Sequence, residues 1–251
     1  MVASGCKSSS GSAVMSVGDE LILGELVDSN RDFILRRLNQ VGIPASMAMT
    51  VSDDLPDIVS GLSFLIQNGH DPIFLCGGLG GTHDDRTREG VARALNLPLE
   101  RHSQCMEVLQ ERYQAGLNEQ RSRMADLPRG AKLIHNPLGA PGFNVGPIFA
   151  FPGFPRMLKP MVESILDEYF EPNQSDLIEI LFDCTEGVIA TEVENFSRQW
   201  PGYRIGLYAN SEPGVKQVRL RIRTIGSFTG EFRQVIRQLQ QDLESKIPKI
   251  G

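Results

Sequence analysis

Residues 73–87 read IFLCGGLGGTHDDRT, and this stretch decides the fold that we expect for the chain. Its first four residues are apolar, a pattern typical of a buried strand. Four glycines within the next five residues let the backbone take positive φ and approach a ligand closely. Acidic and hydroxyl-bearing residues then open a helix. The stretch therefore predicts a strand, a glycine loop and a helix in succession.

The glycine loop also predicts a binding site for an anionic ligand. The amides of Gly77–Thr82, with the N-terminus of the following helix, would form a cradle for phosphate oxygens. Asp84 and Asp85 would hold a divalent metal or accept a proton. The loop carries neither the Gly-Lys-Ser/Thr of a Walker A motif nor the G-x-G-x-x-G spacing of a dinucleotide fingerprint. The alternative is a plain glycine turn in which Asp84 or Asp85 caps the helix.

Strands alternate with helices on both sides of this loop. The expected strands are residues 13–17, 45–51, 73–76 and 148–151. Such alternation predicts an α/β fold, a three-layer, doubly wound, mostly parallel sheet covered by helices on both faces. Ligands of such sheets bind outside the carboxyl ends of the strands. Asp19, Glu20 and Asp53 follow strand ends, so we expect them to share one crevice with the glycine loop.

The other segments of this part are less regular. The pattern predicts a connecting loop over residues 21–28 and a helical segment over residues 103–127. Residues 136–143 are rich in turn formers and predict a loop. A helix follows the Pro152–Arg156 loop, and we expect Pro160 in its first turn, where a missing N–H costs little.

A polar linker at residues 171–175 divides the chain into two expected domains. Residues 13–172 form the α/β domain, and residues 175–251 form a small α+β domain. Residues 1–12, rich in Ser and Gly, are expected to be a disordered tail. In the second domain Arg219, Arg221 and Arg223 alternate with apolar residues, which puts their guanidinium groups on one sheet face. They serve either a phosphate or acidic partner or a solvated face.

Bulk composition excludes several classes of protein. The net charge of −6 argues against a general binder of nucleic acid or of anionic membranes, and no apolar run is long enough to span a bilayer. The N-terminus lacks the apolar core of a secretory signal. The four cysteines form no C-x-x-C pair, and the four histidines show no ligand spacing. We therefore expect a reduced, cytoplasmic protein, and the glycine loop indicates a phosphorylated partner.

Four motifs carry a resemblance to one known family. They are GDELILGE with VDSN at residues 18–30, GGLGGTHDDRT at 77–87, NPLGAPGF at 136–143 and FPGFPRM at 151–157. In this order they resemble the molybdopterin-binding fold, and more narrowly the N-terminal domain of competence/damage-inducible protein A (CinA) and its stand-alone relatives. The resemblance covers residues 13 to about 245, because YRIGLY at 203–208 is similar to the small domain that follows in those proteins. We expect no nicotinamide-mononucleotide deamidase domain of the kind that full-length CinA carries.

The resemblance also implies the residues of the site. Asp84 and Asp85 would hold a divalent metal, Mg²⁺, Mn²⁺ or Co²⁺, and together with Asp53 they would carry the chemistry. The implied ligand contacts are Asp19, Glu20, Gly24, Asp28, Asn30, Gly77, Gly78, Leu79, Gly80, Gly81, Thr82, Thr87, Pro152, Gly153, Pro155 and Arg156. Arg156 is expected to pair with a phosphate. A homo-oligomer is implied as well.

Three functions remain open. The CinA resemblance implies metal-dependent cleavage of the pyrophosphate in ADP-ribose or a similar dinucleotide. The wider fold implies binding or adenylylation of molybdopterin, with Asp85 and Asp53 matching functional aspartates of those relatives. The third function is a non-catalytic nucleotide-binding module. Two departures from the family pattern favour it: Gly81 replaces the usual proline, and residues 139–142 lack the usual threonine.

Overall fold

The computed structural model describes residues 11–170, 176–212 and 214–247. Contacts divide the chain into two units, residues 1–172 and 173–251, and each unit is described by itself. Residues 1–10 of the predicted tail and the predicted linker at 171–175 lie outside the described residues. Ser12 does not belong to a tail, because it is the first residue of a strand.

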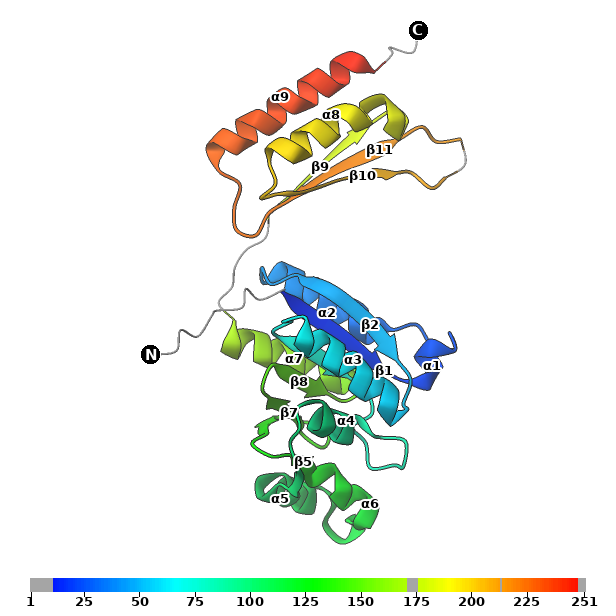
Figure 1. Ribbon diagram of the computed structural model, residues 1–251, viewed down its shortest axis with the longest axis vertical. Helices are drawn as coiled ribbons and strands as arrows, with labels where there is room; N and C mark the ends of the chain where they lie inside the picture. Colours follow the sequence, from blue (N-terminus) through cyan, green and yellow to red (C-terminus); the bar gives the residue numbers. More distant parts are fainter. Residues whose placement is uncertain (1–10, 171–175, 213, 248–251) are drawn as a thin grey trace. The chain divides into compact units, whose positions relative to one another are not determined.

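The first unit is built on a six-stranded sheet with the order β2-β1-β3-β8-β7-β6 (Figure 1). Its strands are β1 (Ser12–Val17), β2 (Ala45–Val51), β3 (Ile73–Cys76), β8 (Ile148–Phe151), β7 (Gly142–Val145) and β6 (Lys132–Ile134). β2, β1, β3 and β8 pair in parallel with one another, whereas β7 pairs antiparallel with both β8 and β6. The expected mostly parallel sheet is therefore confirmed.

Helices cover both faces of this sheet. One face packs against α2 (Ser29–Gln40) and α7 (Pro155–Tyr169), and the other against α3 (Leu55–Gln67), α4 (Thr87–Ala94) and α5 (Ser103–Tyr113). Successive strand residues point to opposite faces, so Val14 and Phe74 join the first core while Met15 and Leu75 join the second. All four side chains are fully buried. The three-layer α/β fold class is confirmed.

The structure corrects two predictions near the site. The expected loop at 21–28 is preceded and partly replaced by a one-turn helix, α1 (Asp19–Ile22). Pro160 lies inside α7 and not in its first turn, because the helix already begins at Pro155. Proline is well suited to a first helical position, and Pro155 takes that role here.

The expected helical segment at 103–127 is broken into short pieces. After α5 come η1 (Gln114–Gly116), α6 (Glu119–Ser122), η2 (Arg123–Ala125) and a strand, β5 (Asp126–Pro128), which pairs with β4 (Leu99–Arg101). The helix ends where Gln114 takes a positive φ of 45°. Asn118 then starts a new helix, since its side chain accepts a hydrogen bond from the Arg121 amide. The predicted loop at 136–143 likewise gives way to a strand, β7, at Gly142.

The second unit is a small α+β fold. Its antiparallel sheet has the order β10-β11-β9, from strands Arg204–Ala209, Val218–Arg223 and Leu177–Phe182. Two helices, α8 (Glu186–Gln199) and α9 (Gly230–Lys246), pack on one face around Phe196 and Phe232 (Figure 1). On the alternate positions of β11, Arg221 pairs with Glu179, which also lies 4.0 Å from Arg219.

Candidate ligand-binding site

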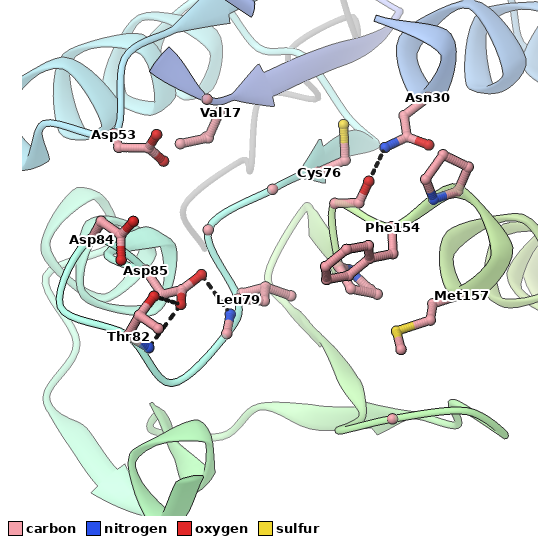
Figure 2. A pocket seen from close by; sticks show the side chains of 18 of the residues that line it. Val17, Asn30, Asp53, Cys76, Leu79, Thr82, Asp84, Asp85, Phe154 and Met157 are labelled. Atoms are coloured by element: carbon pink, nitrogen blue, oxygen red, sulfur yellow. Dashed lines mark hydrogen bonds between the residues drawn. The ribbon is translucent and has the colours of Figure 1, made fainter. Parts of the chain in front are cut away.

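The carboxyl ends of β1, β2, β3 and β8 meet at one edge of the first unit's sheet, where a cavity of about 670 Å³ opens (Figure 2). This volume is typical of a site for a small ligand. Fifteen of the predicted site residues line it: Glu20, Asp28, Asn30, Asp53, Gly77, Gly78, Leu79, Gly80, Gly81, Thr82, Asp84, Asp85, Pro152, Gly153 and Pro155.

Four other predicted residues do not line the cavity. Asp19 is exposed, and its carboxylate accepts a hydrogen bond from the Asp53 amide at 3.1 Å. Gly24 is exposed in a turn with φ +73°. Thr87 is fully buried and donates its hydroxyl to the Gly77 carbonyl oxygen at 2.8 Å. Arg156 is exposed in the first turn of α7, outside the lining.

Glycine is required at the first two positions of the loop after β3. Gly77 has φ +104°, and a Cβ atom there would lie 2.1 Å from the carbonyl oxygen of Val17. Gly78 has φ +60°, and its Cβ would lie 2.4 Å from the Thr87 hydroxyl. Positive φ is open to glycine at little cost, and the missing side chains allow both close approaches. The loop is therefore packed tightly between β1 and α4.

The Asp85 carboxylate holds the conformation of the glycine loop by accepting hydrogen bonds from it. Its Oδ1 accepts a hydrogen bond from the Gly80 amide at 2.7 Å, and its Oδ2 accepts from the Thr82 amide at 2.8 Å and from the Thr82 hydroxyl (Figure 2). The alternative in which Asp84 or Asp85 caps the helix is wrong. Helix α4 begins at Thr87 with Arg86 as N-cap and has no side-chain cap.

These hydrogen bonds decide which loop amides can meet a ligand. The Gly77 amide donates to the Phe151 carbonyl oxygen at 3.1 Å, and Asp85 takes the amides of Gly80 and Thr82. Within the described part of the chain, the amides of Gly78, Leu79 and Gly81 have no protein acceptor. The predicted cradle of six amides is thus reduced to three.

Carboxylates gather on one side of the cavity. Burial raises the pKa of Asp53, and the carboxylates of Asp19, Glu20 and Asp84 raise it further, although the Asp19 amide at 2.9 Å acts in the opposite direction. Asp84 is exposed, and the Thr82 hydroxyl beside it lowers its pKa. Mutual repulsion of these groups is the kind of charge imbalance that a cation relieves.

The lining contains no compensating side-chain charge. Among the described lining residues there is no Lys, Arg or His, whereas five are acidic: Glu20, Asp28, Asp53, Asp84 and Asp85. Across residues 11–170, 176–212 and 214–247, no three His, Cys, Asp or Glu side chains come together to hold a metal by themselves. A divalent cation would fit here only if the ligand supplied part of its coordination, as phosphate oxygens do for Mg²⁺.

The opposite side of the cavity is apolar. Phe154 and Met157 lie there, across from Asp53, Asp84 and Asp85 (Figure 2), and Phe154 is 67% exposed. Leu26 and Val27 are further apolar residues of the lining. Cys76 also lines the cavity, but burial raises the pKa of its thiol to about 12. The thiol therefore stays protonated near neutral pH and offers no nucleophile. This side suits a planar ring.

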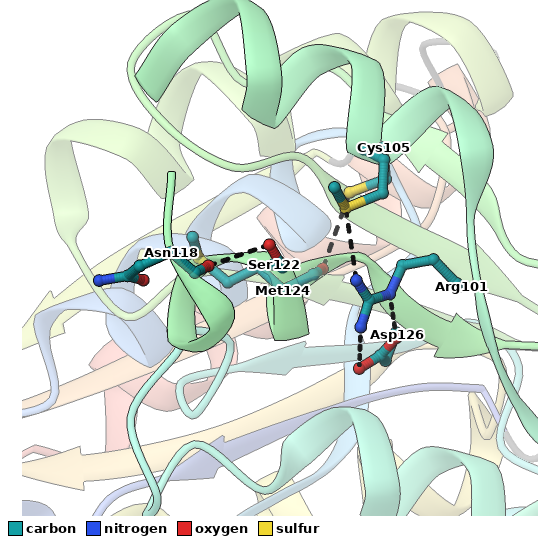
Figure 3. A network of polar contacts seen from close by, with 7 residues as sticks. Arg101, Cys105, Asn118, Ser122, Met124 and Asp126 are labelled. Atoms are coloured by element: carbon teal, nitrogen blue, oxygen red, sulfur yellow. Dashed lines mark hydrogen bonds and ion pairs between the residues drawn. The ribbon is translucent and has the colours of Figure 1, made fainter. Parts of the chain in front are cut away.

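A wall that the sequence did not predict comes from the end of α5 and from the broken segment after it. Tyr113, the last residue of α5, and Met124, in η2, line the cavity. The segment is held by Arg101, whose guanidinium pairs with Asp126 at 2.5 Å, and by the Cys105 thiol, which lies 3.7 Å from the Met124 carbonyl oxygen (Figure 3). No local pattern marks these residues, since contacts between distant parts of the chain bring them to the cavity.

Gly81 lets this segment approach the glycine loop. A Cβ atom on residue 81 would lie 2.5 Å from the carbonyl oxygen of Gln120 in α6. The proline that is usual in the family pattern would need more room than this packing leaves. The departure at Gly81 therefore goes with a close contact between α6 and the loop.

Three further lining residues, Asn136, Gly139 and Ala140, come from the NPLGAPGF motif. Asn136 is buried; its side chain donates to the Ala140 carbonyl oxygen at 2.8 Å and accepts from the Leu138 amide at 3.0 Å. The motif belongs to the family resemblance, but the predicted site contains none of its residues. Its place in the family pattern was the signal that could have found them.

Comparisons with known proteins show the family of the chain. The family model described as a probable molybdopterin binding domain matches residues 13–171. A CinA-like protein of Citrifermentans bemidjiense is 35% identical over 245 residues, which cover 93% of this chain and 58% of that protein. A protein of Pyrococcus horikoshii is 38% identical over 166 residues, which cover 60% of this chain and 65% of that protein.

One solved structure is similar to the first unit. The crystal structure of the protein CinA from Thermoplasma acidophilum, described as having unknown function, matches with a TM-score of 0.60 and 30% sequence identity. The match covers 64% of this chain and 98% of that one. No helix among the described residues has the length and apolar character needed to cross a membrane.

Proposed function

This chain belongs to the molybdopterin-binding domain family, as a CinA-type member, and on that basis we propose that its cavity binds a small phosphorylated nucleotide and cleaves the pyrophosphate bond of an ADP-ribose-like molecule with the help of a divalent cation. One observation carries the proposal: loop amides without protein acceptors share the cavity with a group of carboxylates, while its described lining has no cationic side chain. Amides bind anionic oxygens directly, whereas carboxylates bind them only through a cation.

The proposed contacts for the phosphates are the amides of Gly78, Leu79 and Gly81. An array of two or three N–H groups matches the oxygens of one phosphoryl group. The loop is already fixed by Asp85, by Thr87 and by the packing of Gly77 against β1. A loop held in this way loses little conformational entropy when a ligand binds.

The heterocyclic ring of the ligand is proposed to lie on the apolar side. Phe154 and Met157 form this surface together with Leu26 and Val27. An exposed aromatic side chain beside a cavity provides a face on which an adenine ring can stack. The ring and the phosphates would then occupy opposite sides of the same cavity.

A divalent cation is proposed because of charge. A diphosphate brings negative charge into a cavity lined by five acidic residues, and this repulsion must be offset. Mg²⁺ is usually held by one or two carboxylates together with substrate phosphates. Asp84, which is exposed and has a lowered pKa, is the leading protein contact for it. Asp85, whose Oδ1 accepts one hydrogen bond and keeps a lone pair, is the second proposed contact, and Asp53 is left to accept a proton.

Hydrolysis would follow from this arrangement. The oxygen of a water molecule forms a bond to one phosphorus, the bridging P–O bond breaks, and the water's proton passes to Asp53. The bridging oxygen leaves with the other phosphate, so ADP-ribose yields AMP and ribose 5-phosphate. The raised pKa of Asp53 makes it a better proton acceptor than an ordinary aspartate. The bound cation supplies neutralisation of the phosphoryl charge.

Molybdopterin is the second candidate ligand. The matching family model carries its name, and the apolar side of the cavity suits a pterin ring as well as an adenine. A pterin phosphate would use the same loop amides. Binding or adenylylation of molybdopterin would then replace hydrolysis of a dinucleotide.

Calorimetric titration tests the proposal and separates the candidates. The protein is titrated with ADP-ribose, with ATP and with a molybdopterin precursor, each in the presence and absence of Mg²⁺. We expect ADP-ribose to bind about tenfold more tightly with Mg²⁺, which corresponds to about 1.4 kcal/mol. Asp84→Asn should remove most of that gain, whereas Asp54→Asn, a change at an exposed carboxylate outside the lining, should keep it. Release of AMP is followed by chromatography.

Each outcome decides between functions. Equal affinity with and without Mg²⁺ would refute the role of the cation. Tight binding of ADP-ribose without release of AMP would assign a non-catalytic nucleotide-binding module. A clear preference for the molybdopterin precursor would assign the pterin function instead.

A further inference from the structure

The first turn of α4 holds three successive carbonyl groups of the glycine loop. The Thr87 hydroxyl donates to the Gly77 carbonyl oxygen at 2.8 Å, and the Thr87 amide donates to that of Gly78 at 3.1 Å. The Arg88 guanidinium donates to the Leu79 carbonyl oxygen at 2.6 Å. Two adjacent residues of one helix therefore fix the orientation of three consecutive peptide groups.

This fixes the direction of the amides as well. A trans peptide is planar, so its N–H points away from its own C=O. With the carbonyls of Gly77 and Gly78 turned towards α4, the N–H groups of Gly78 and Leu79 point away from that helix. The peptide between Leu79 and Gly80 indicates the direction of these N–H groups. Its own N–H, on Gly80, donates to the carboxylate of Asp85, which lines the cavity. Parallel amides of this kind form a concave anion site.

Arg88 adds charge behind this site. Its side chain is 7% exposed and makes no ion pair within 4.0 Å among the described residues; its contacts are the Leu79 carbonyl oxygen and, at 3.4 Å, that of Asp85. Burial lowers the pKa of the Arg88 guanidinium, although the nearby carboxylates of Asp85 and Asp126 act in the opposite direction. The positive charge behind the loop raises the electrostatic potential there, beside a cavity whose described lining has no cationic side chain.

We propose that Thr87 and Arg88 are positioning residues that turn the amides of Gly78 and Leu79 towards one phosphoryl group of the ligand, with Arg88 supplying positive potential from behind the loop. Neither residue lines the cavity, so both act through the backbone. This inference rests on the proposed function, because it assumes that the cavity takes a phosphorylated ligand. It replaces the predicted direct contact of Thr87 with the ligand.

Two matched pairs of variants test it. Arg88→Met removes the donors and the charge, and Arg88→Lys restores the charge and one donor. Thr87→Val keeps the shape of a fully buried side chain but loses the hydroxyl, and Thr87→Ser restores it. Affinities for ADP-ribose and for adenosine are measured with Mg²⁺ present, and circular dichroism shows that each variant is folded. The Thr87 pair keeps the test available if Arg88→Met does not fold.

The expected result is a loss confined to the phosphorylated ligand. Arg88→Met should weaken ADP-ribose by about 10- to 100-fold and Thr87→Val by about 3- to 10-fold, since a lost hydrogen bond leaves a carbonyl free to turn. Adenosine affinity should change by less than about twofold, because no loop amide binds it. Thr87→Ser should match the wild type, and Arg88→Lys should fall between the wild type and Arg88→Met.

Three results would count against the inference, and they differ from a failure of the proposed function. Equal losses for ADP-ribose and adenosine would show a merely structural role. Equal affinities of Thr87→Val and Thr87→Ser for ADP-ribose would show that the Thr87 hydroxyl does not orient the loop amides. Unchanged ADP-ribose affinity in Arg88→Met would show that Arg88 has no part in binding the ligand. A wild-type protein that binds no phosphorylated ligand would refute the proposed function, and this inference with it.

Discussion

Two loops leave the same edge of the sheet and present opposite surfaces to one cavity. The loop after β3 has carbonyls bound by Thr87 and Arg88 and amides that face away from them. The loop after β8, residues 152–154, begins with Pro152, ends in an exposed Phe154 and leads into Pro155, the first residue of α7. Proline has no N–H, so this second loop cannot form a comparable array of amides.

Neighbouring parallel strands thus supply two kinds of recognition. β3 and β8 pair directly, and their ends lie side by side. Asn30 fixes the second loop by donating to the Gly153 carbonyl oxygen at 2.6 Å. Backbone amides on one loop suit an anion, and the apolar ring on the other suits a heterocycle. The difference indicates that the cavity is shaped for a molecule that carries both.

The largest difference between the two loops should appear in stability when one methyl group is added to each of them. Gly77→Ala places a Cβ 2.1 Å from the Val17 carbonyl oxygen at φ +104°, whereas Gly153→Ala places one 3.6 Å from the Gly77 α-carbon, an ordinary contact. We expect Gly77→Ala to lower the free energy of unfolding by more than about 3 kcal/mol, and Gly153→Ala to change it by less than about 1 kcal/mol. Urea unfolding followed by circular dichroism measures both.

Gly24→Ala is the matched control for strain alone. Its φ is +73°, and no atom lies within 4 Å of the added Cβ. It should cost about 1–2 kcal/mol, the usual penalty of a left-handed conformation. If Gly77→Ala were no worse than Gly24→Ala, the tight packing of the first loop against β1 would be wrong.

A smaller effect is expected at the second loop. Phe154→Ala should weaken ADP-ribose by about fivefold, or about 1 kcal/mol, because a stacking surface is lost. Affinity for inorganic pyrophosphate should not change, since that ion has no ring. Stability should change by less than about 0.5 kcal/mol, because the side chain is 67% exposed. Calorimetric titration with both molecules gives the comparison.

Phe64→Ala serves as the control for a solvent-facing phenylalanine elsewhere. Phe64 is 46% exposed on α3 and does not line the cavity. It should leave both affinities unchanged. If Phe154→Ala lowered the affinities for ADP-ribose and pyrophosphate equally, the two loops would not bind different parts of the ligand.

The parts of this site that could be predicted are those set by local sequence. The runs at residues 45–51, 73–76 and 148–151 form the expected strands. The apolar residues at 73–76 and 148–151 are buried in the sheet, whereas 45–51 form an edge strand that is only partly buried. The glycines could be assigned to a loop for the same local reason. Since parallel strands end at one edge, Asp53 and Asp84 could also be placed at one cavity.

The parts that could not be predicted depend on contacts between distant residues. Tyr113 and Met124 line the cavity from a segment that approaches the glycine loop at Gly81 and Gln120 and in which Arg101 pairs with Asp126. The hydrogen bonds that Asp85 accepts from its own loop could not be predicted either. A pattern locates a carboxylate, but it does not tell whether that carboxylate faces a ligand or accepts hydrogen bonds from its own loop.

The smallest effect concerns charge at the rim beside the glycine loop. The pKa of Asp53 is raised from its ordinary value of 3.8, mainly by burial and also by nearby carboxylates. The folded state therefore binds a proton more tightly than the unfolded state, so the stability of the protein falls as the pH rises through and above that value. Asp53→Asn removes this cost. We expect the variant to melt higher than the wild type at neutral pH, with the difference shrinking towards about pH 4.

The same melting comparison in the presence of Mg²⁺ tests the role of the cation. A cation held by Asp84 and a bound phosphate would stabilise the ionised carboxylate of Asp53 beside them, so Mg²⁺ with ADP-ribose should shrink or reverse the advantage of Asp53→Asn at neutral pH. Asp54→Asn, the same change at the neighbouring exposed carboxylate, controls for net charge. A melting difference between Asp53→Asn and the wild type that stays constant across the carboxyl range would mean that burial and repulsion do not act on Asp53. The acidic side of the cavity would then have no electrostatic reason to recruit a cation, and the amides of the glycine loop would have to bind the phosphates without one.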